Sequence, residues 1–124
     1  MPPKGIATQA HETGRPYYIH SCCKVDELME DFIDDVGIDA KHSFQDNVLC
    51  IVEYKKRWGH RVGLLGGVDV DRLTSDAHDD LRLYVRRIIE SCSGGGRFAV
   101  SAGNSIPSYI PVENYLTMLD EVLR

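Results

Sequence analysis

The sequence predicts an α/β protein in which parallel strands alternate with helices. Three observations carry this prediction: a short apolar run precedes a polar turn and a stretch of helical periodicity, the pattern recurs four times, and glycine follows each of the first three helical stretches. Successive βα units form one parallel sheet with helices packed on it, through right-handed crossovers. Two architectures fit: a small open α/β sheet, or half of an eight-unit barrel.

The predicted strands cover residues 16–20, 38–44, 61–69 and 97–101. After the first strand, a helix is predicted over residues 24–36 because its apolar residues recur at steps of three and four. This stripe consists of Val25, Leu28, Met29, Phe32, Ile33 and Val36. Gly37 then stands where a left-handed C-cap is expected.

The next two units show similar start and stop signals. The second helix is predicted to begin near Asn47, with Asp46 or Asn47 as its N-cap, and to end before Gly59. The third strand is continuously apolar in its middle, which is typical of a strand covered on both faces. Asp76 is the predicted N-cap of the third helix, whose apolar stripe ends with Cys92.

The last helix is predicted to begin at Pro111, where a missing N–H costs nothing. Its predicted buried residues are Val112, Tyr115, Leu116, Leu119 and either Val122 or Leu123. Residues 1–14 are polar and are predicted to form an arm or a frayed helix, so the folded domain is expected to span residues 15–124.

The composition limits the function classes. The 124 residues suffice for one domain, and the formal net charge of −5 argues against nucleic acid or an anionic membrane as the main partner. No apolar run approaches the roughly 20 residues that a membrane helix needs. The first residues show no secretory signal, so a cytoplasmic location with reduced cysteines is expected.

The carboxyl ends of parallel strands meet at one rim, where functional loops gather. The residues expected there are His20, Ser21, Cys22, Ser43, Phe44, Gly66, Gly67, Asp69, Ser101 and Asn104.

The His-Ser-Cys run from residue 20 to 22 suggests a metal half-site. Residues two apart on a strand face the same way, so His20 and Cys22 can approach one point, and zinc suits this ligand pair. His42 is the best candidate for a third ligand, followed by Asp69. Alternatively, the stretch holds a surface histidine and two reduced thiols, with Cys23 pointing the other way.

Two further stretches could bind a substrate. Gly66 and Gly67 end the third strand, where they permit close approach of a ligand or simply form a turn. The small polar loop over residues 101–107 could hold an anionic group with its backbone N–H donors, or be a plain connector. The candidate substrate-binding residues are Gly67, Asp69, Ser101, Asn104 and Ser105. Cys50 and Cys92 are interpreted as core cysteines in helices.

In sequence order, residues 19–22, 65–69, 95–107 and 111–115 resemble the uroporphyrinogen decarboxylase superfamily. The resemblance implies a (β/α)8 barrel with its active site at the C-terminal rim. Members include methyltransferases that use zinc to move a methyl group from a corrinoid protein to a thiol, and His20 and Cys22 match two of their zinc ligands. Asn104 stands where that branch has its third ligand, a cysteine, and where the decarboxylase branch tends to have a histidine.

The resemblance also implies a barrel about twice as long as this chain. Residues 15–124 correspond to its C-terminal half, four of the eight units, and the N-terminal half would hold the substrate-carboxylate arginines and an essential aspartate. A half-barrel exposes two strand edges. We therefore expect either a homodimer around a two-fold axis or a complementary half-barrel chain.

Three functions remain open. The first is methyl transfer from a corrinoid to a thiol with zinc at His20 and Cys22. The second is decarboxylation of uroporphyrinogen in porphyrin biosynthesis, which needs positive charge around an acidic tetrapyrrole, whereas the expected rim offers only Lys24, Lys41 and Arg97. The third is a non-catalytic, self-assembling half-barrel, because the missing half leaves the isolated chain without a complete active site.

Overall fold

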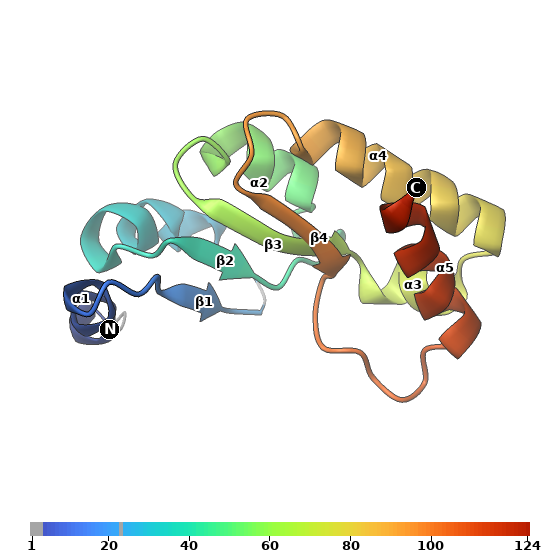
Figure 1. Cartoon of the computed structure of the whole chain (residues 1–124), viewed down its shortest axis with the longest axis horizontal. Coiled ribbons are helices and arrows are strands. Elements are labelled where there is room, and N and C mark those ends of the chain that lie inside the picture. The colour runs from blue at the N-terminus through green and yellow to red at the C-terminus, as the bar shows by residue number, and fades with distance from the viewer. Residues whose placement is uncertain (1–3, 23) are drawn as a thin grey trace.

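A computed structural model describes residues 4–22 and 24–124 (Figure 1). Its elements, in chain order, are α1 (Lys4–Glu12), β1 (Tyr18–His20), the 3-10 turn η1 (Asp26–Leu28), the π-helix η2 (Asp31–Val36), β2 (Ala40–His42), α2 (Ile51–Trp58), β3 (Gly63–Val68), α3 (Val70–Ser75), α4 (His78–Cys92), β4 (Phe98–Ala102) and α5 (Val112–Leu123). The four strands form one sheet in the order β1-β2-β3-β4, and every neighbouring pair is parallel. The predicted half of a barrel is therefore confirmed.

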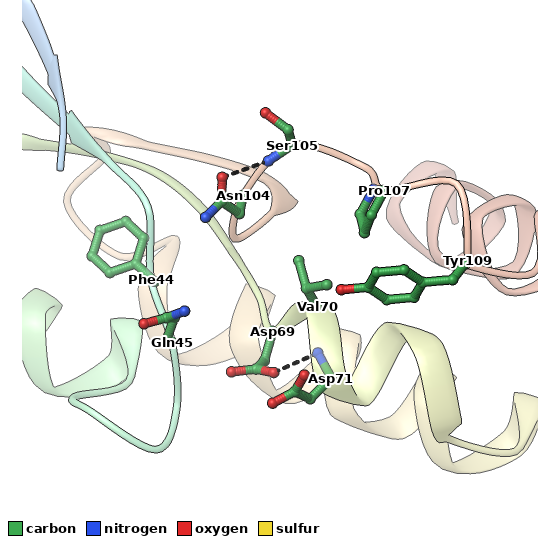
Figure 2. A pocket seen from close by; sticks show the side chains of 9 residues that line it. All are labelled: Phe44, Gln45, Asp69, Val70, Asp71, Asn104, Ser105, Pro107 and Tyr109. Carbon is green, nitrogen blue, oxygen red and sulfur yellow. Dashed lines mark hydrogen bonds between the residues drawn. The ribbon is translucent and has the colours of Figure 1, made fainter. Parts of the chain in front are cut away.

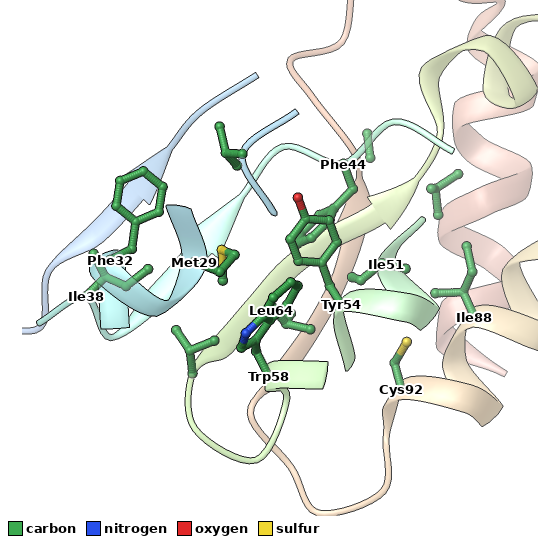
Figure 3. Packing of buried hydrophobic residues seen from close by; sticks show 14 of the residues in the cluster. Met29, Phe32, Ile38, Phe44, Ile51, Tyr54, Trp58, Leu64, Ile88 and Cys92 are labelled. Atoms are coloured by element: carbon green, nitrogen blue, oxygen red, sulfur yellow. The ribbon is translucent and has the colours of Figure 1, made fainter. Parts of the chain in front are cut away.

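The hydrophobic core lies between the sheet and its helices. Leu64 of β3 is fully buried, and Figure 3 shows it in the same cluster as Met29, Tyr54 and Trp58. Helix α4 contributes a fully buried apolar stripe to this cluster, which includes Leu81 and Val85. None of the helices in the described ranges is long and apolar enough to cross a membrane.

The first helical segment is less regular than its periodicity predicts. Instead of one α-helix over residues 24–36, the chain forms η1 and then η2. The Phe32 carbonyl accepts hydrogen bonds from both Gly37 N–H (2.9 Å) and Ile38 N–H (3.0 Å), which closes the wider π turn. Gly37 has φ 82° and is the predicted left-handed C-cap.

The predicted start of the second helix is wrong. Helix α2 begins at Ile51 and not near Asn47, so Cys50 precedes the helix. Asp46 does not cap it, because the Asp46 N–H donates to the Asp69 carboxylate (2.6 Å) and its own carboxylate accepts from the Tyr84 hydroxyl (2.6 Å). Tertiary hydrogen bonds thus compete successfully with local capping.

Asp76 is likewise not the N-cap of the third helix. It follows the short helix α3, which the sequence pattern did not predict. The Asp76 carboxylate accepts a hydrogen bond from Arg72 Nε (2.6 Å). Helix α4 begins after Ala77 with no side-chain cap. The cap of α3 is Asp69, whose carboxylate accepts from Asp71 N–H (2.8 Å).

The N-terminal residues predicted to be an arm or a frayed helix include helix α1, which packs against η2. Ala7 is fully buried, and the His11 ring meets the Asp39 carboxylate at 2.7 Å. The fold therefore uses residues before position 15.

Helix α5 contradicts its predicted burial in part: Tyr115 and Val122 are partly buried against the core, but the other predicted residues are exposed. Val112, Leu116 and Leu123 are exposed (66, 55 and 85%), and so is Leu119 (37%). Its buried residues are Asn114, Thr117, Met118 and Glu121. Polar contacts hold this face: Asn114 donates to the Leu73 carbonyl (2.9 Å), and Glu121 accepts from Arg82 and Arg86.

Candidate functional site

The candidate site lies at the carboxyl ends of the strands, which share one edge because the sheet is parallel. His20 ends β1 and His42 ends β2, and the register places the two histidines directly opposite each other. Asn104 follows β4 closely and contacts the same cluster. The structure thus brings together three of the predicted site residues, His20, His42 and Asn104, around Cys22.

The two histidines form a chain of hydrogen bonds with a defined direction. His42 Nε2 lies 3.2 Å from the Ala102 carbonyl, which can only accept, so His42 carries its proton on Nε2. His42 Nδ1 is then the acceptor for His20 Nδ1–H across 2.9 Å. His20 Nε2 therefore has a free lone pair, and it faces Cys22 Sγ at 3.6 Å. Burial, followed by the nearby His42 and Lys41, lowers the pKa of His20 and favours this neutral ring.

Cys22 receives two further hydrogen bonds at its exposed sulfur. Ser43 Oγ and Asn104 Nδ2 each donate to Sγ across 3.5 Å. The Asn104 oxygen accepts from Ser105 N–H (2.8 Å), which turns the amide nitrogen toward the sulfur. The hydrogen bonds from Ser43 and Asn104 lower the pKa of Cys22 from its ordinary value, because they stabilise the charged sulfur.

A buried lysine supports this cluster, although the sequence predicted Lys41 only as one of the few basic residues of the rim. Lys41 is only 1% exposed, its ammonium donates to the Ser43 carbonyl, and it lies 4.1 Å from the centre of the Phe44 ring. Burial lowers the pKa of Lys41 to about 8. The available sequence signal was a lysine within the predicted strand over residues 38–44, because a lysine is almost never fully buried unless its ammonium has a partner.

The spacing of His20 and Cys22 suits two ligands of one zinc ion. Zinc bonds of about 2.3 Å to sulfur and 2.05 Å to nitrogen place two tetrahedral ligands roughly 3.6 Å apart, and His20 Nε2 and Cys22 Sγ have that separation. His42 contacts the other nitrogen of His20, as a supporting residue would. Within the described part of the chain no three His, Cys, Asp or Glu side chains gather as a metal site, so these residues do not complete a zinc centre.

Asp69 has a structural role at the rim. Its two carboxylate oxygens accept from Asp71 N–H and Asp46 N–H, and only 5% of the residue is exposed. It lines a cavity of about 180 Å³ together with Asn104 and Ser105 (Figure 2). This cavity is smaller than the roughly 300 Å³ at the low end of small-molecule sites.

The remaining substrate-binding candidates divide between the two faces of the sheet. A side chain at Gly67 would meet Ile51 and Ile88, so this glycine faces the helix layer and not the rim. Its φ of 108° follows a φ of 117° at Gly66, and a side chain at Gly66 would meet the His42 ring. Ser101 lines a second cavity of about 240 Å³ between β4 and α5.

This second cavity is an apolar groove at the open edge of the sheet. It is lined by His42, Val100, Ser101, Ala102, Asn104, Ser105, Ile106, Tyr115, Met118, Leu119 and Val122. Since His42 and Asn104 belong both to the groove and to the Cys22 cluster, the candidate site directly borders the open edge at β4.

Among the described residues, Cys50, Cys92 and Arg97 lie away from the site. Cys92 is fully buried, and burial raises its pKa to about 11, as expected for a core cysteine. Cys50 is half-buried at the start of α2, and the prediction made for Cys23 lies outside the described residues. Arg97 precedes β4 and bonds to the His60 carbonyl, so it lies at the opposite end of the strand from the expected rim.

Comparisons with known proteins agree with this architecture. A family model described as uroporphyrinogen decarboxylase (URO-D) matches residues 2–124. Among solved structures, a methyltransferase from Methanosarcina mazei is similar with a TM-score of 0.75 and 19% sequence identity over 96% of this chain. The chain spans 34% of the length of that methyltransferase. No curated protein sequence matches the chain.

Proposed function

Since this chain belongs to the uroporphyrinogen decarboxylase family, we propose that it is a half-barrel that acts only after a second copy closes its sheet. The observation that carries the proposal is the open edge of β4, where an apolar groove and the exposed leucines of α5 have no covering layer in the described chain. In a complete βα barrel, an apolar surface beside a strand is normally buried by the neighbouring unit.

A second copy is the occupant that the topology favours. Strands β1 and β4 are the two edges of one parallel sheet. A two-fold axis along the barrel axis would place β4 of one copy beside β1 of the other, also parallel, and would bring the strand number to the eight of a closed barrel. The groove beside β4 would then become interior.

The rim of the assembled barrel supports thiol chemistry of the methyl-transfer type. His20 Nε2 and Cys22 Sγ face one point with the separation of two zinc ligands, and a zinc ion bound there would activate a thiol substrate as a thiolate. The chain supplies two donors and presents Asn104 Nδ2 where a third would stand. We therefore propose that the isolated chain is inactive and that a corrinoid protein would be its methyl donor only in a completed site.

Decarboxylation of uroporphyrinogen is the weaker candidate. Cations would have to surround the acidic tetrapyrrole, yet Arg97 lies at the far end of β4 and the Lys41 ammonium is engaged by the Ser43 carbonyl. Lys41 is buried, and of the two exposed residues only Lys24 is not at the far end of β4. The cavity of about 180 Å³ at Asp69 is also too small for a tetrapyrrole.

The decisive experiment combines light scattering with elemental analysis on the purified chain. We expect a dimer with less than one zinc per chain. A monodisperse monomer that does not bind a hydrophobic dye would contradict the proposed assembly. Stoichiometric zinc that is lost in Cys22→Ser, and retained in Cys50→Ser, would instead show that two protein donors suffice for an occupied site.

A further inference from the structure

Lys41 is an unusual residue for the interior of this domain. Its side chain is 1% exposed, and its ammonium is surrounded by the Ser43 carbonyl and the faces of Phe44 (4.1 Å) and Tyr54 (4.8 Å). Each of these contacts is favourable to a cation, but none is a carboxylate. Taking an ammonium out of water is costly without an opposite charge. The cost of burying Lys41 therefore indicates that the contact of its ammonium with the Ser43 carbonyl matters to the fold.

The ammonium holds a strained turn. Ser43 has φ 87°, in the left-handed region that glycine prefers and serine rarely adopts. A turn of this kind at the end of β2 needs an external contact to persist, and the hydrogen bond from Lys41 Nζ to the Ser43 carbonyl supplies one. The same turn directs the Ser43 hydroxyl at Cys22 Sγ, 3.5 Å away.

We propose that Lys41 is a positioning residue, whose buried ammonium holds Ser43 in the left-handed conformation that brings the Ser43 hydroxyl to the Cys22 sulfur. Lys41 acts on the thiol through Ser43. The inference deepens the proposed function, because it rests on Cys22 being the reactive group of the rim. It also explains why a buried lysine, Lys41, and a left-handed serine, Ser43, occur together at the end of β2.

Other groups face Cys22 and must be separated from this effect. His20 faces the sulfur with Nε2, and Asn104 donates to it from the loop after β4. The charge of Lys41 itself also attracts a thiolate through space. A test must therefore distinguish the direct charge of Lys41 from its hold on Ser43.

The test measures the rate at which iodoacetamide alkylates Cys22 at pH 7, on the metal-free full chain, with the site assigned by mass spectrometry. Ser43→Gly removes the hydroxyl but suits φ 87°, so we expect alkylation to slow by about 3- to 10-fold while the melting temperature stays equal or rises. A residue that served only the turn would show the stability gain without the loss of rate. Lys24→Met, which removes an exposed lysine, is the control for general charge effects.

The double variant decides whether Lys41 works through Ser43. We expect Lys41→Met to slow alkylation by a similar factor, and Lys41→Met with Ser43→Gly to be no slower than the slower single variant. Factors that multiply in the double variant would mean that the charge acts directly, and would overturn the proposal. An unchanged rate in Ser43→Gly would overturn it as well. Neither result depends on zinc or on dimer formation, so the assembly proposal stands or falls separately.

Discussion

Leucines of the apolar stripes differ in burial between the helix-covered half of this molecule and its open edge. Leu81 in α4 is fully buried, whereas Leu116 in α5 is 55% exposed, although both lie on stripes that predict burial. The difference lies in the covering layer: α4 packs against the sheet, α2 and α5, while Leu116 and Leu123 lie on a part of α5 that is exposed in the described chain. Periodicity therefore identifies an apolar face that is suited to burial, but it does not indicate whether the same chain supplies the covering surface.

The candidate site lies on the boundary between these two regions. Ser43 follows the inner strand β2 and is buried, and Cys22 follows the edge strand β1, while His42 and Asn104 also line the open groove. Closing the groove would remove water from one side of the cluster and strengthen its hydrogen bonds. The comparison thus predicts that the completed side determines stability and that the open side determines assembly.

The largest effect is expected from a cavity on the completed side. Leu81→Ala should lower the free energy of unfolding by about 3 kcal/mol, because a fully buried leucine loses both its transfer energy and its packing. Urea denaturation followed by circular dichroism measures this change. Leu83→Ala is the matched control in the same helix, where the side chain is 53% exposed and a change below about 0.5 kcal/mol is expected.

The next effect concerns the buried charge of Lys41. Its pKa of about 8 in the fold lies below the roughly 10.4 of an unfolded lysine, so the unfolded chain binds more protons between these values. Stability should therefore rise with pH across this window, by roughly 3 kcal/mol in total from this group, with the full penalty present below pH 8. Lys41→Met should remove this rise, measured as the difference between the two pH–stability curves. Parallel curves would mean that the ammonium is not buried in solution.

The four strands could be predicted from the sequence because each βα unit repeats its own local signals, whereas the family resemblance was needed to favour half of a barrel over a small open sheet. The meeting of His20 with Cys22 was also predictable, since parallel strands share a rim and alternate residues share a face. The positions of the strands and the meeting of His20 with Cys22 depend only on local pattern and on the geometry of a parallel sheet.

The missed features depend on contacts between distant residues. Asp69 caps α3 and also binds Asp46 N–H, so a carboxylate that looked like a ligand serves the backbone. Ser43 has no sequence signal for its left-handed φ of 87°, because the burial of Lys41, whose ammonium donates to the Ser43 carbonyl, depends on Tyr54 from another element. The exposure of α5 was unpredictable in another way: its stripe follows the rule, and the surface that would cover it is not among the described residues.

The third prediction concerns the open edge alone. Leu119→Lys places a charge in the groove beside β4, so the proposed dimer should dissociate at least tenfold more readily while the monomer keeps its stability within about 0.5 kcal/mol. Lysine is chosen because it suits the C-terminal half of a helix. Sedimentation over a concentration series measures the dimer. Leu83→Lys, at a residue of α4 that is 53% exposed and outside the groove, is the control and should leave dissociation unchanged.

The smallest effect is expected at Leu116, and it tests the comparison most directly. Leu116→Ala repeats the Leu81 substitution in an exposed position, so the free energy of unfolding at low protein concentration should change by less than about 0.5 kcal/mol. The measurement is urea denaturation at two protein concentrations about a hundredfold apart. If the loss stays small at both, Leu116 is exposed in the assembled protein as well. If it grows at the higher concentration, the partner covers α5 beyond the groove, and the interface is larger than the β4 edge. A large loss at the lower concentration would contradict the open edge itself, because the leucine would then be buried within a single chain.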